Sequence, residues 1–171
     1  MGLLQVSSVT VTSPTASIIL TGIDDDSVYK CVITNASNNS GDHQLRMRVA
    51  NGGTQDSASA YDYAGILTRT ISYGTNAVTN ATFYGATTSG TATNEAQNYI
   101  FYFYNWYSQT EYSFWTHEEV SFDSNSRLTG DQGSGVFTQA ERHDSVRFFT
   151  GQSVSSEFDT TQGTFTLYKV V

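Results

Sequence analysis

The residue types that could act as nucleophiles, bases or zinc ligands are few in this chain and lie far apart. His43, His117 and His143 occur at unrelated positions, and none stands at a ligand spacing from another histidine or from the single cysteine. Ser134 lies between two glycines in DQGSG, but this segment lacks the G-x-S-x-G pattern of a hydrolase nucleophile. These residues predict a protein without catalytic residues, and we expect no enzyme.

The acidic residues and the cysteine also predict structural roles. Glu118 and Glu119 are adjacent in a predicted strand, so their carboxylates point to opposite faces and cannot act as a pair. The run DDD at residues 24–26 lacks the spaced ligands and the glycine of a calcium loop, and is typical of a solvated turn. Cys31 lies in the middle of a predicted strand, where a buried and inert thiol is expected. We therefore expect no metal and no cofactor.

The densest aromatic stretch, NYIFYFYNWYSQTEYSFW, has ten aromatic side chains in eighteen residues. Strand alternation puts Phe101 and Phe103 on one face, and these side chains are expected in the core because they carry no polar atom. Tyr102, Tyr104 and Trp106 fall on the opposite face, where a hydroxyl or an indole N–H can contact water. This second face is expected to form a subunit contact or, alternatively, a surface that stacks on sugar rings.

The strand that follows shows cleaner alternation, and its row with Phe114 and Val120 is expected to face the core. Trp115 and His117 fall in the other row, which is expected to face solvent. The segment SQTE between the two strands suits a hairpin connection. Trp115 is therefore expected on the strand next to Trp106, where both would belong to one aromatic surface.

The segment LRMRV is a third region with a clear pattern. Leu45, Met47 and Val49 are expected to point inward, and Arg46 and Arg48 share the outer face of the same strand. In a chain with twice as many acidic as basic residues, outward arginines are expected to meet carboxylates. The sequence leaves open whether these carboxylates lie on a neighbouring strand or on a partner protein.

The charge and length of the chain limit the class of protein. Sixteen acidic residues against eight basic ones give a net charge of −8, and a surface of that sign repels phosphate backbones, so nucleic acid is not an expected partner. No run approaches the eighteen or so apolar residues of a membrane span, and the first residues lack the basic and apolar regions of a signal peptide. We expect neither a membrane partner nor a processed leader.

Apolar and polar residues alternate with period two along nearly the whole chain, which is typical of strands. The predicted strands are LLQVSSVTV, ASIILTG, SVYKCVIT, HQLRMRVA, YDYAGILTRTISY, ATFYGA, NYIFYFYNWY, EYSFWTHEEVSF, GVFTQ, SVRFF and TFTLYKVV. Clusters such as GIDDD and SNSRLTGDQGSG predict turns, and ATNEAQ and TQAERHDS could each form one helical turn. The pattern predicts one all-β domain over residues 1–171, an antiparallel β-sandwich of jelly-roll-like form.

Motifs along nearly the whole chain resemble a set of virion structural proteins from tailed phages, particularly short-tailed phages of marine bacteria. The residues that carry the resemblance are Tyr29, Leu45, Arg48, Gly53, Ser59, Tyr61, Tyr63, Gly163, Thr164, Leu167 and Tyr168. The resemblance implies a jelly-roll-like subunit in the virion, either a head decoration (cement) protein or part of a fibre. Its partners would be the major capsid protein or other virion proteins.

Together, these patterns predict a non-enzymatic structural protein, with a capsid decoration subunit as the first expectation. The alternative is a tail fibre or a receptor- or carbohydrate-binding module that uses exposed aromatic residues. Because Tyr102, Tyr104 and Trp106 would lie bare on an isolated subunit, we also expect a homo-oligomer, with a trimer favoured.

Overall fold

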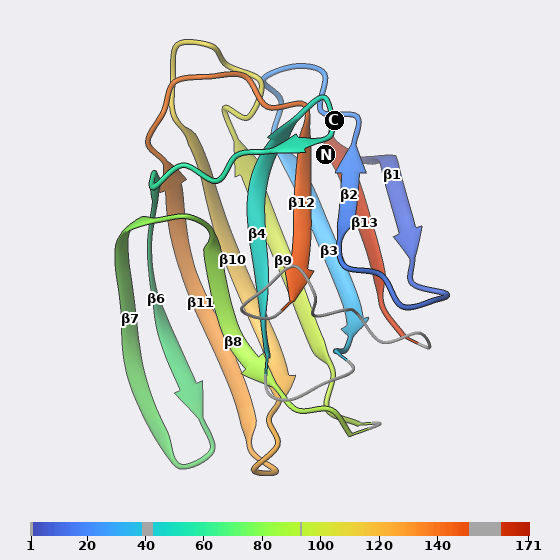
Figure 1. Ribbon diagram of the computed structural model, residues 1–171, viewed down its shortest axis with the longest axis vertical. Coiled ribbons are helices and arrows are strands. Elements are labelled where there is room, and N and C mark those ends of the chain that lie inside the picture. Colours follow the sequence, from blue (N-terminus) through green and yellow to red (C-terminus); the bar gives the residue numbers. More distant parts are fainter. Residues whose placement is uncertain (1, 39–42, 93, 151–161) are drawn as a thin grey trace.

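The computed structural model describes all residues except 1, 39–42, 93 and 151–161. Its described part has no helix and forms two antiparallel sheets packed as a β-sandwich (Figure 1). The single helical turns predicted for ATNEAQ and TQAERHDS are therefore wrong for the described residues of those segments. The all-β prediction is confirmed, whereas the jelly-roll connectivity is not confirmed by the strand order.

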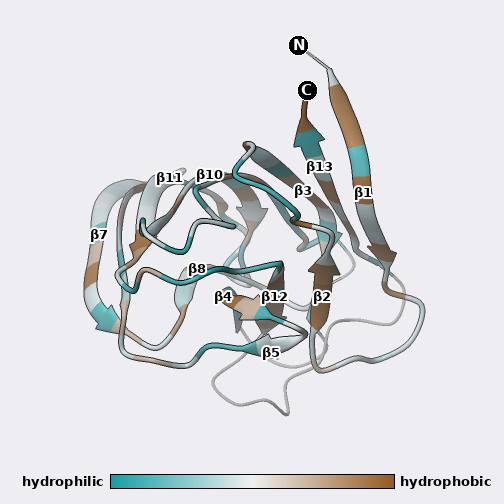
Figure 2. Cartoon of the chain, turned by 90° about the horizontal axis from the view of Figure 1, so that it is seen from above, coloured by the Kyte–Doolittle hydropathy of each residue, from teal (hydrophilic) through white to brown (hydrophobic). Residues whose placement is uncertain are grey.

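The larger sheet has eight strands in the order β1-β13-β3-β9-β10-β11-β6-β7. Their bounds are β1 Leu3–Thr10, β3 Tyr29–Ala36, β6 Tyr61–Arg69, β7 Ser72–Ala81, β9 Gln97–Tyr104, β10 Ser113–Phe122, β11 Leu128–Phe137 and β13 Thr164–Val170. The smaller sheet consists of β2 Ile18–Thr21, β12 Ser145–Thr150, β4 His43–Asn51, β5 Thr54–Gln55 and β8 Tyr84–Ser89. Seen end-on, the two sheets lie one above the other as separate layers (Figure 2).

The core lies between the two sheets and is built from inward rows on both of them. Phe101 and Phe103 on β9 are fully buried, as the sequence predicted, and pack against Phe148 of β12 and Phe165 of β13 in one apolar cluster. The predicted inward row of β4 is confirmed in the same way, because Leu45, Met47 and Val49 have no exposed surface. Cys31 belongs to this cluster, and its burial raises the pKa of the thiol far above its ordinary value.

Two strands, β7 and β11, lie largely outside the predicted strand boundaries. The predicted strand over residues 61–73 is a hairpin, because the chain turns between β6 and β7 at Thr70 and Ile71. The cluster SNSRLTGDQGSG is a turn only in its first residues, and from Leu128 it forms β11, which pairs along its whole length with β10 and β6. The glycines and polar residues of this segment are typical of a turn, so the sequence pattern did not predict the strand. The small residues of β11 instead make room for large side chains of β10.

The face of β10 that points into the core is opposite to the predicted one. Trp115 is 1% exposed and His117 is 3% exposed, whereas Phe114 of the other row is 43% exposed. The reason is the register with β9, in which Trp115 lies opposite Phe103 and His117 opposite Phe101. Directly opposite residues in antiparallel strands share a face, so the buried row of β9 fixes that of β10.

The inward residues of β10 fit because β11 has glycines opposite them. Gly135 lies opposite Trp115 and Gly133 lies opposite His117. A Cβ atom at Gly135 would stand 2.1 Å from Cζ2 of Trp115, and one at Gly133 would stand 2.9 Å from Cε1 of His117. The large aromatic rings therefore occupy the space that these glycines leave open.

Replacing Gly135 by alanine should destabilise the protein by about 2 kcal/mol, because the indole of Trp115 is held in a packed core and must shift. Urea unfolding followed by far-UV circular dichroism measures this change. Gly74→Ala on the edge strand β7 is the matched control, since no atom lies within 4 Å of a Cβ placed there. Equal stability of the two variants would contradict the proposed role of Gly135.

Trp106 is also buried, which corrects its predicted position on the outward aromatic face. β9 ends at Tyr104, and Asn105 adopts a left-handed conformation with φ of 55°, which interrupts the strand alternation. The indole of Trp106 then turns into the core, where its ring centroid lies 4.4 Å from that of Phe103. Its Nε1–H donates to the carbonyl oxygen of Ser145 at 3.1 Å, so the polar atom is paired inside the protein.

Candidate binding face

The eight-stranded sheet has one side that no other layer of the described chain covers, and we call this side the outer face. The large apolar and aromatic side chains along its middle are Ile66, Ile100, Tyr102, Tyr104, Phe114, Val120, Phe122, Leu128 and Val136. Among them Phe114, Val120 and Ile66 are exposed by 43%, 50% and 55%. Several exposed apolar side chains on one face of a sheet are typical of protein contact sites.

The outer face has few charges compared with the whole chain. In its described part we find Lys30, Asp62 and Glu118. Lys30 reaches over the ring of Tyr102, with its Nζ 5.5 Å from the ring centroid. Because few ionised groups would have to lose water, a protein surface could cover this face at low desolvation cost.

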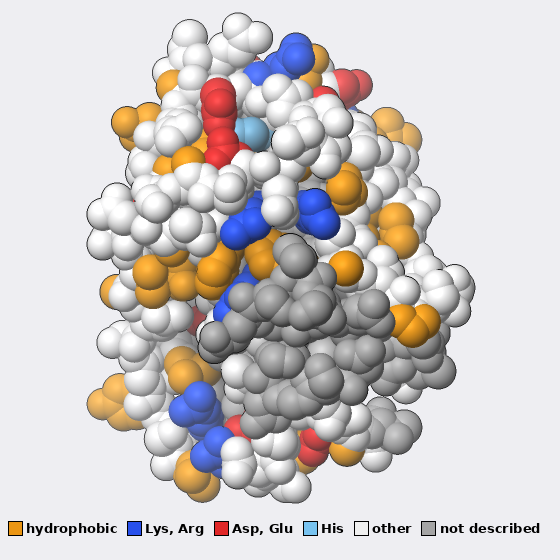
Figure 3. All heavy atoms as spheres, in the orientation of Figure 1, with side chains coloured by type: hydrophobic (Ala, Val, Ile, Leu, Met, Phe, Trp, Pro, Cys, Tyr) orange, Lys and Arg blue, Asp and Glu red, His pale blue; other side chains and the backbone are white. Residues whose placement is uncertain are grey.

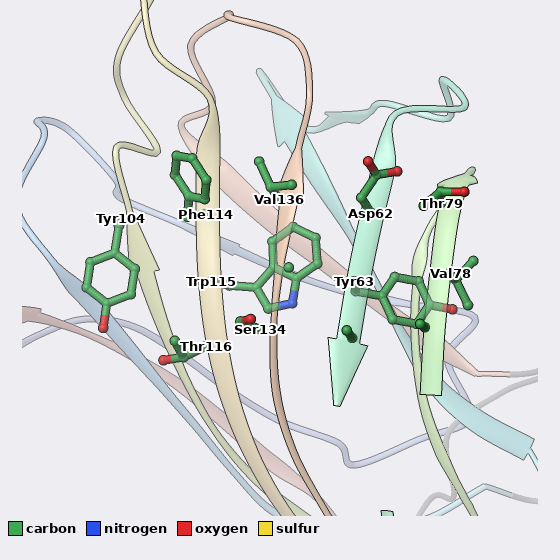
Figure 4. Close-up of a pocket in the computed structure, with 13 residues that line it drawn as sticks. Asp62, Tyr63, Val78, Thr79, Tyr104, Phe114, Trp115, Thr116, Ser134 and Val136 are labelled. Carbon is green, nitrogen blue, oxygen red and sulfur yellow. The ribbon is translucent and has the colours of Figure 1, made fainter. Parts of the chain in front are cut away.

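A shallow hollow of about 510 Å³ lies at one end of the outer face, across strands β9, β10, β11, β6 and β7 (Figure 4). Small residues line its middle, namely Ala64, Ala77, Ser134 and Gly135. Larger side chains line it as well, namely Tyr104, Phe114, Val136 and Asp62. The hollow therefore combines aromatic rings with a carboxylate and hydroxyl groups, which can stack on a ligand and accept hydrogen bonds from it.

The structure separates the residues that the sequence grouped into one aromatic surface. Tyr102 and Tyr104 lie on the outer face as predicted and are half-buried. Trp106 and Trp115 are buried in the core, and Trp115 borders the hollow with almost no exposed surface. Phe114 takes their place on the face, and sequence reasoning missed it because it assigned the rows of β10 the wrong way round. The alternating glycines of β11 were the signal that could have corrected this.

Arg46 and Arg48 lie on the outer side of the smaller sheet, and not beside the aromatic face. Their outward direction is as predicted, since they alternate with the buried row of β4. The predicted carboxylate partners are absent from the described residues, where no ion pair involves either arginine. Each guanidinium instead stacks on a phenylalanine ring.

Ser113, His143 and Glu141 form an arrangement that resembles a catalytic triad in its contacts. Ser113 Oγ is 3.0 Å from Nδ1 of His143, and Nε2 of His143 is 3.5 Å from Oε1 of Glu141. Ser113 has no exposed surface, however, and His143 is 1% exposed, so a substrate carbonyl cannot reach the hydroxyl in this conformation. Burial lowers the pKa of His143 to about 4, and the neutral ring joins the loop after β11 to β10. The run ERHD at residues 141–144 is by its composition expected to form an exposed connection, but His143 is buried.

A second group of polar side chains is buried between the sheets. Nε2 of His117 lies 3.6 Å from Oδ1 of Asp131, and the imidazole packs on the ring of Tyr84 from β8. Glu119 accepts hydrogen bonds from the hydroxyl and the backbone N–H of Thr87. Burial raises the pKa of Glu119, while the bonds from Thr87 act in the opposite direction. Glu118 is exposed, which confirms that the two adjacent carboxylates lie on opposite faces.

The raised pKa of Glu119 predicts a stability that falls as the pH rises. The carboxyl of Glu119 binds its proton more tightly in the folded state than in the unfolded chain. The protonated carboxyl therefore contributes its full share of stability below the ordinary pKa of 4.5, and this stability is lost as the pH rises through the folded-state pKa. The Glu119→Gln variant should not show this loss. At pH 8 it should be more stable than the parent by about 1.4 kcal/mol for each pH unit by which the folded-state pKa of Glu119 exceeds its ordinary value. Thermal unfolding at pH 4 to 8 measures the effect. Glu118→Gln should unfold like the parent, and a larger effect there would contradict the assignment.

The first two carboxylates of the acidic run at residues 24–26 are paired with a lysine. Nζ of Lys169 bonds to carboxylate oxygens of Asp24 and Asp25, and the hydroxyl of Tyr29 donates to Asp24 at 2.8 Å. The hydrogen bond from Lys169 is the main cause that lowers the pKa of Asp25 to about 2. Across the described residues, no group of three His, Cys, Asp or Glu side chains is arranged to hold a metal ion.

Comparisons of the chain with family models, with curated proteins and with solved structures gave no significant match. The described part of the chain contains no helix that is long and apolar enough to cross a bilayer. The functional proposal therefore depends on the outer face, and on the motifs that resemble those of phage virion proteins.

Proposed function

We propose that this protein is a non-enzymatic structural subunit of a virion, and that it attaches to the head lattice as a decoration (cement) protein through the outer face. The observation that carries the proposal is the set of exposed apolar side chains on the middle strands of the eight-stranded sheet, with Ile66, Val120 and Leu128 as its most exposed members and Phe114 next. The virion and the major capsid protein as partner come from the resemblance carried by residues such as Tyr29, Arg48 and Gly163.

The shape and chemistry of the outer face favour a protein partner over a small molecule. Apolar side chains extend over several neighbouring strands, and the hollow at one end is shallow and open. Burying apolar area contributes about 25 cal/mol per Å², so a contact over several such side chains contributes several kcal/mol. We also propose self-association into a trimer through Tyr102 and Tyr104 of β9, without Trp106, which is buried.

The test is binding to particles that lack this protein. Purified protein is mixed with such particles at increasing concentration, the particles are sedimented, and the bound copies are located by electron microscopy. Saturable binding at symmetry-related positions on the head, with the outer face toward the lattice, is the expected result. Binding only at a tail or fibre, or no binding at all, would contradict a role as head decoration.

The hollow favours a second candidate function, a module that binds carbohydrate. Tyr104 and Phe114 offer rings on which a sugar can stack, and Asp62, Thr116 and Ser134 provide hydrogen-bonding groups around them (Figure 4). A glycan array separates the two candidates. Specific binding of one saccharide, together with no affinity for particles, would favour the carbohydrate-binding role.

A further inference from the structure

Three arginines gather on the outward side of the smaller sheet, opposite the outer face of the larger one. Arg46 and Arg48 come from β4, and Arg147 of β12 lies directly opposite Arg48 in the antiparallel register. Figure 3 looks onto this side of the molecule and shows Lys and Arg side chains near its middle. We call these three residues the arginine cluster. They are three of only eight basic residues in the chain.

Two phenylalanine rings support the arginine cluster. Cζ of Arg46 lies 4.1 Å from the ring centroid of Phe83, and Cζ of Arg48 lies 5.1 Å from that of Phe149. Nε of Arg48 also donates to the carbonyl oxygen of Thr82 at 2.8 Å. Stacking on aromatic rings fixes the plane of a guanidinium and leaves its edge free to donate to an acceptor.

The arginine cluster forms no ion pair within the described residues, where Asp56 acts on Arg48 only from a longer distance. No carboxylate oxygen there lies within 4.0 Å of the three guanidinium groups. Arg46 is 8% exposed, and its buried Nε has no hydrogen-bond acceptor, as is also true of Nε of Arg147. Like charges directly opposite each other on neighbouring strands destabilise a sheet, so Arg48 and Arg147 repel each other unless an anion lies between them.

We propose that the arginine cluster binds a phosphate or sulfate group, either as the free ion or as an ester on a small molecule. Each guanidinium fork can donate to two oxygens, and a tetrahedral dianion has enough oxygens to bridge two forks. A carboxylate has only two oxygens, and one guanidinium can donate to both of them, so a carboxylate is less suited to bridging two arginines. A nucleic acid strand fits less well, because the rest of the chain is strongly acidic. The proposed site does not depend on the attachment function of the outer face.

The test is thermal unfolding of the full chain in inorganic phosphate, inorganic sulfate, acetate or chloride at equal ionic strength. Phosphate or sulfate at roughly tenfold its dissociation constant should raise the melting temperature by about 3–6 °C over chloride. Acetate should give less than half of that rise. The same measurement with glucose 6-phosphate, and with glucose as its uncharged control, shows whether a phosphate ester binds as the free ion does.

Arg147→Gln and Arg48→Gln should each weaken phosphate binding about tenfold in calorimetric titration, because each removes one charged fork. Without phosphate, both variants should melt no lower than about 2 °C below the parent, since they also relieve repulsion. Arg142→Gln is the matched control, because Arg142 also stacks on an aromatic ring, Tyr107, but stands outside the cluster. Equal stabilisation by chloride, unchanged binding in both cluster variants, or an equal loss in Arg142→Gln would overturn the proposal.

Discussion

Phe114→Asp should weaken attachment to the head lattice by about 100-fold or more while the protein stays folded. Phe114 is 43% exposed at the end of the outer face that holds the hollow, beside Tyr104 and Val136, so a carboxylate there faces water in the free protein. In the attached state the same carboxylate would be buried among apolar groups without a partner. Aromatic residues at the centre of an interface commonly contribute 2 kcal/mol or more, and a buried unpaired charge adds to that loss.

The measurement is the particle sedimentation described above, repeated with the variant over at least three decades of concentration. Ile71→Asp is the control, since Ile71 is 74% exposed at the tip of the β6–β7 hairpin and the change adds the same charge. The control should bind like the parent. If Phe114→Asp also binds like the parent, the lattice contact lies elsewhere and the proposed orientation of the subunit is wrong.

Trp106→Ala should destabilise the fold by about 3–5 kcal/mol, the range for removing a large aromatic side chain from a core. The indole is fully buried against Phe103 and donates to the carbonyl oxygen of Ser145, so the substitution leaves a cavity and removes that bond. A loss of this size is a large part of the 5–15 kcal/mol that typically stabilises a domain. Denaturant unfolding should show a clear shift of the midpoint.

Two comparisons make the test of Trp106 specific. Trp106→Phe keeps most of the apolar volume and should recover more than half of the lost stability. Phe114→Ala should cost less than about 1 kcal/mol, because this side chain is partly exposed in the free protein. A Trp106→Ala variant that is as stable as the parent but fails to bind particles would restore the role that the sequence alone suggested for this residue.

The sequence was sufficient for the fold class because period-two alternation depends only on neighbouring residues. It also predicted the inward rows of β9 and β4, because Phe101, Phe103 and Leu45 have no polar atom that would favour contact with water. It failed on β10, where both rows contain large apolar residues and the local pattern favoured the wrong one. Only the pairing with β9 decides the direction of Trp115, and pairing is a long-range property that a single strand does not encode.

The candidate site was predicted in part for a related reason. Tyr102 and Tyr104 follow strict alternation inside β9, so their direction could be predicted. Trp106 lies two residues past the end of the strand, and the left-handed Asn105 reverses the alternation there. Asparagine is one of the few residue types that readily adopt this conformation. The asparagine directly before Trp106 could therefore have indicated that the strand ends there.

The position of β13 in the larger sheet has a consequence for how the chain is made. β13 is the last strand in sequence, yet it lies between β1, the first strand, and β3. Until residues 164–170 have emerged from the ribosome, β1 has no native partner in this sheet, and one edge of β3 stays unpaired. The sheet is therefore completed only after synthesis reaches its final strand, and a nascent chain exposes edges to which other chains could pair in the meantime.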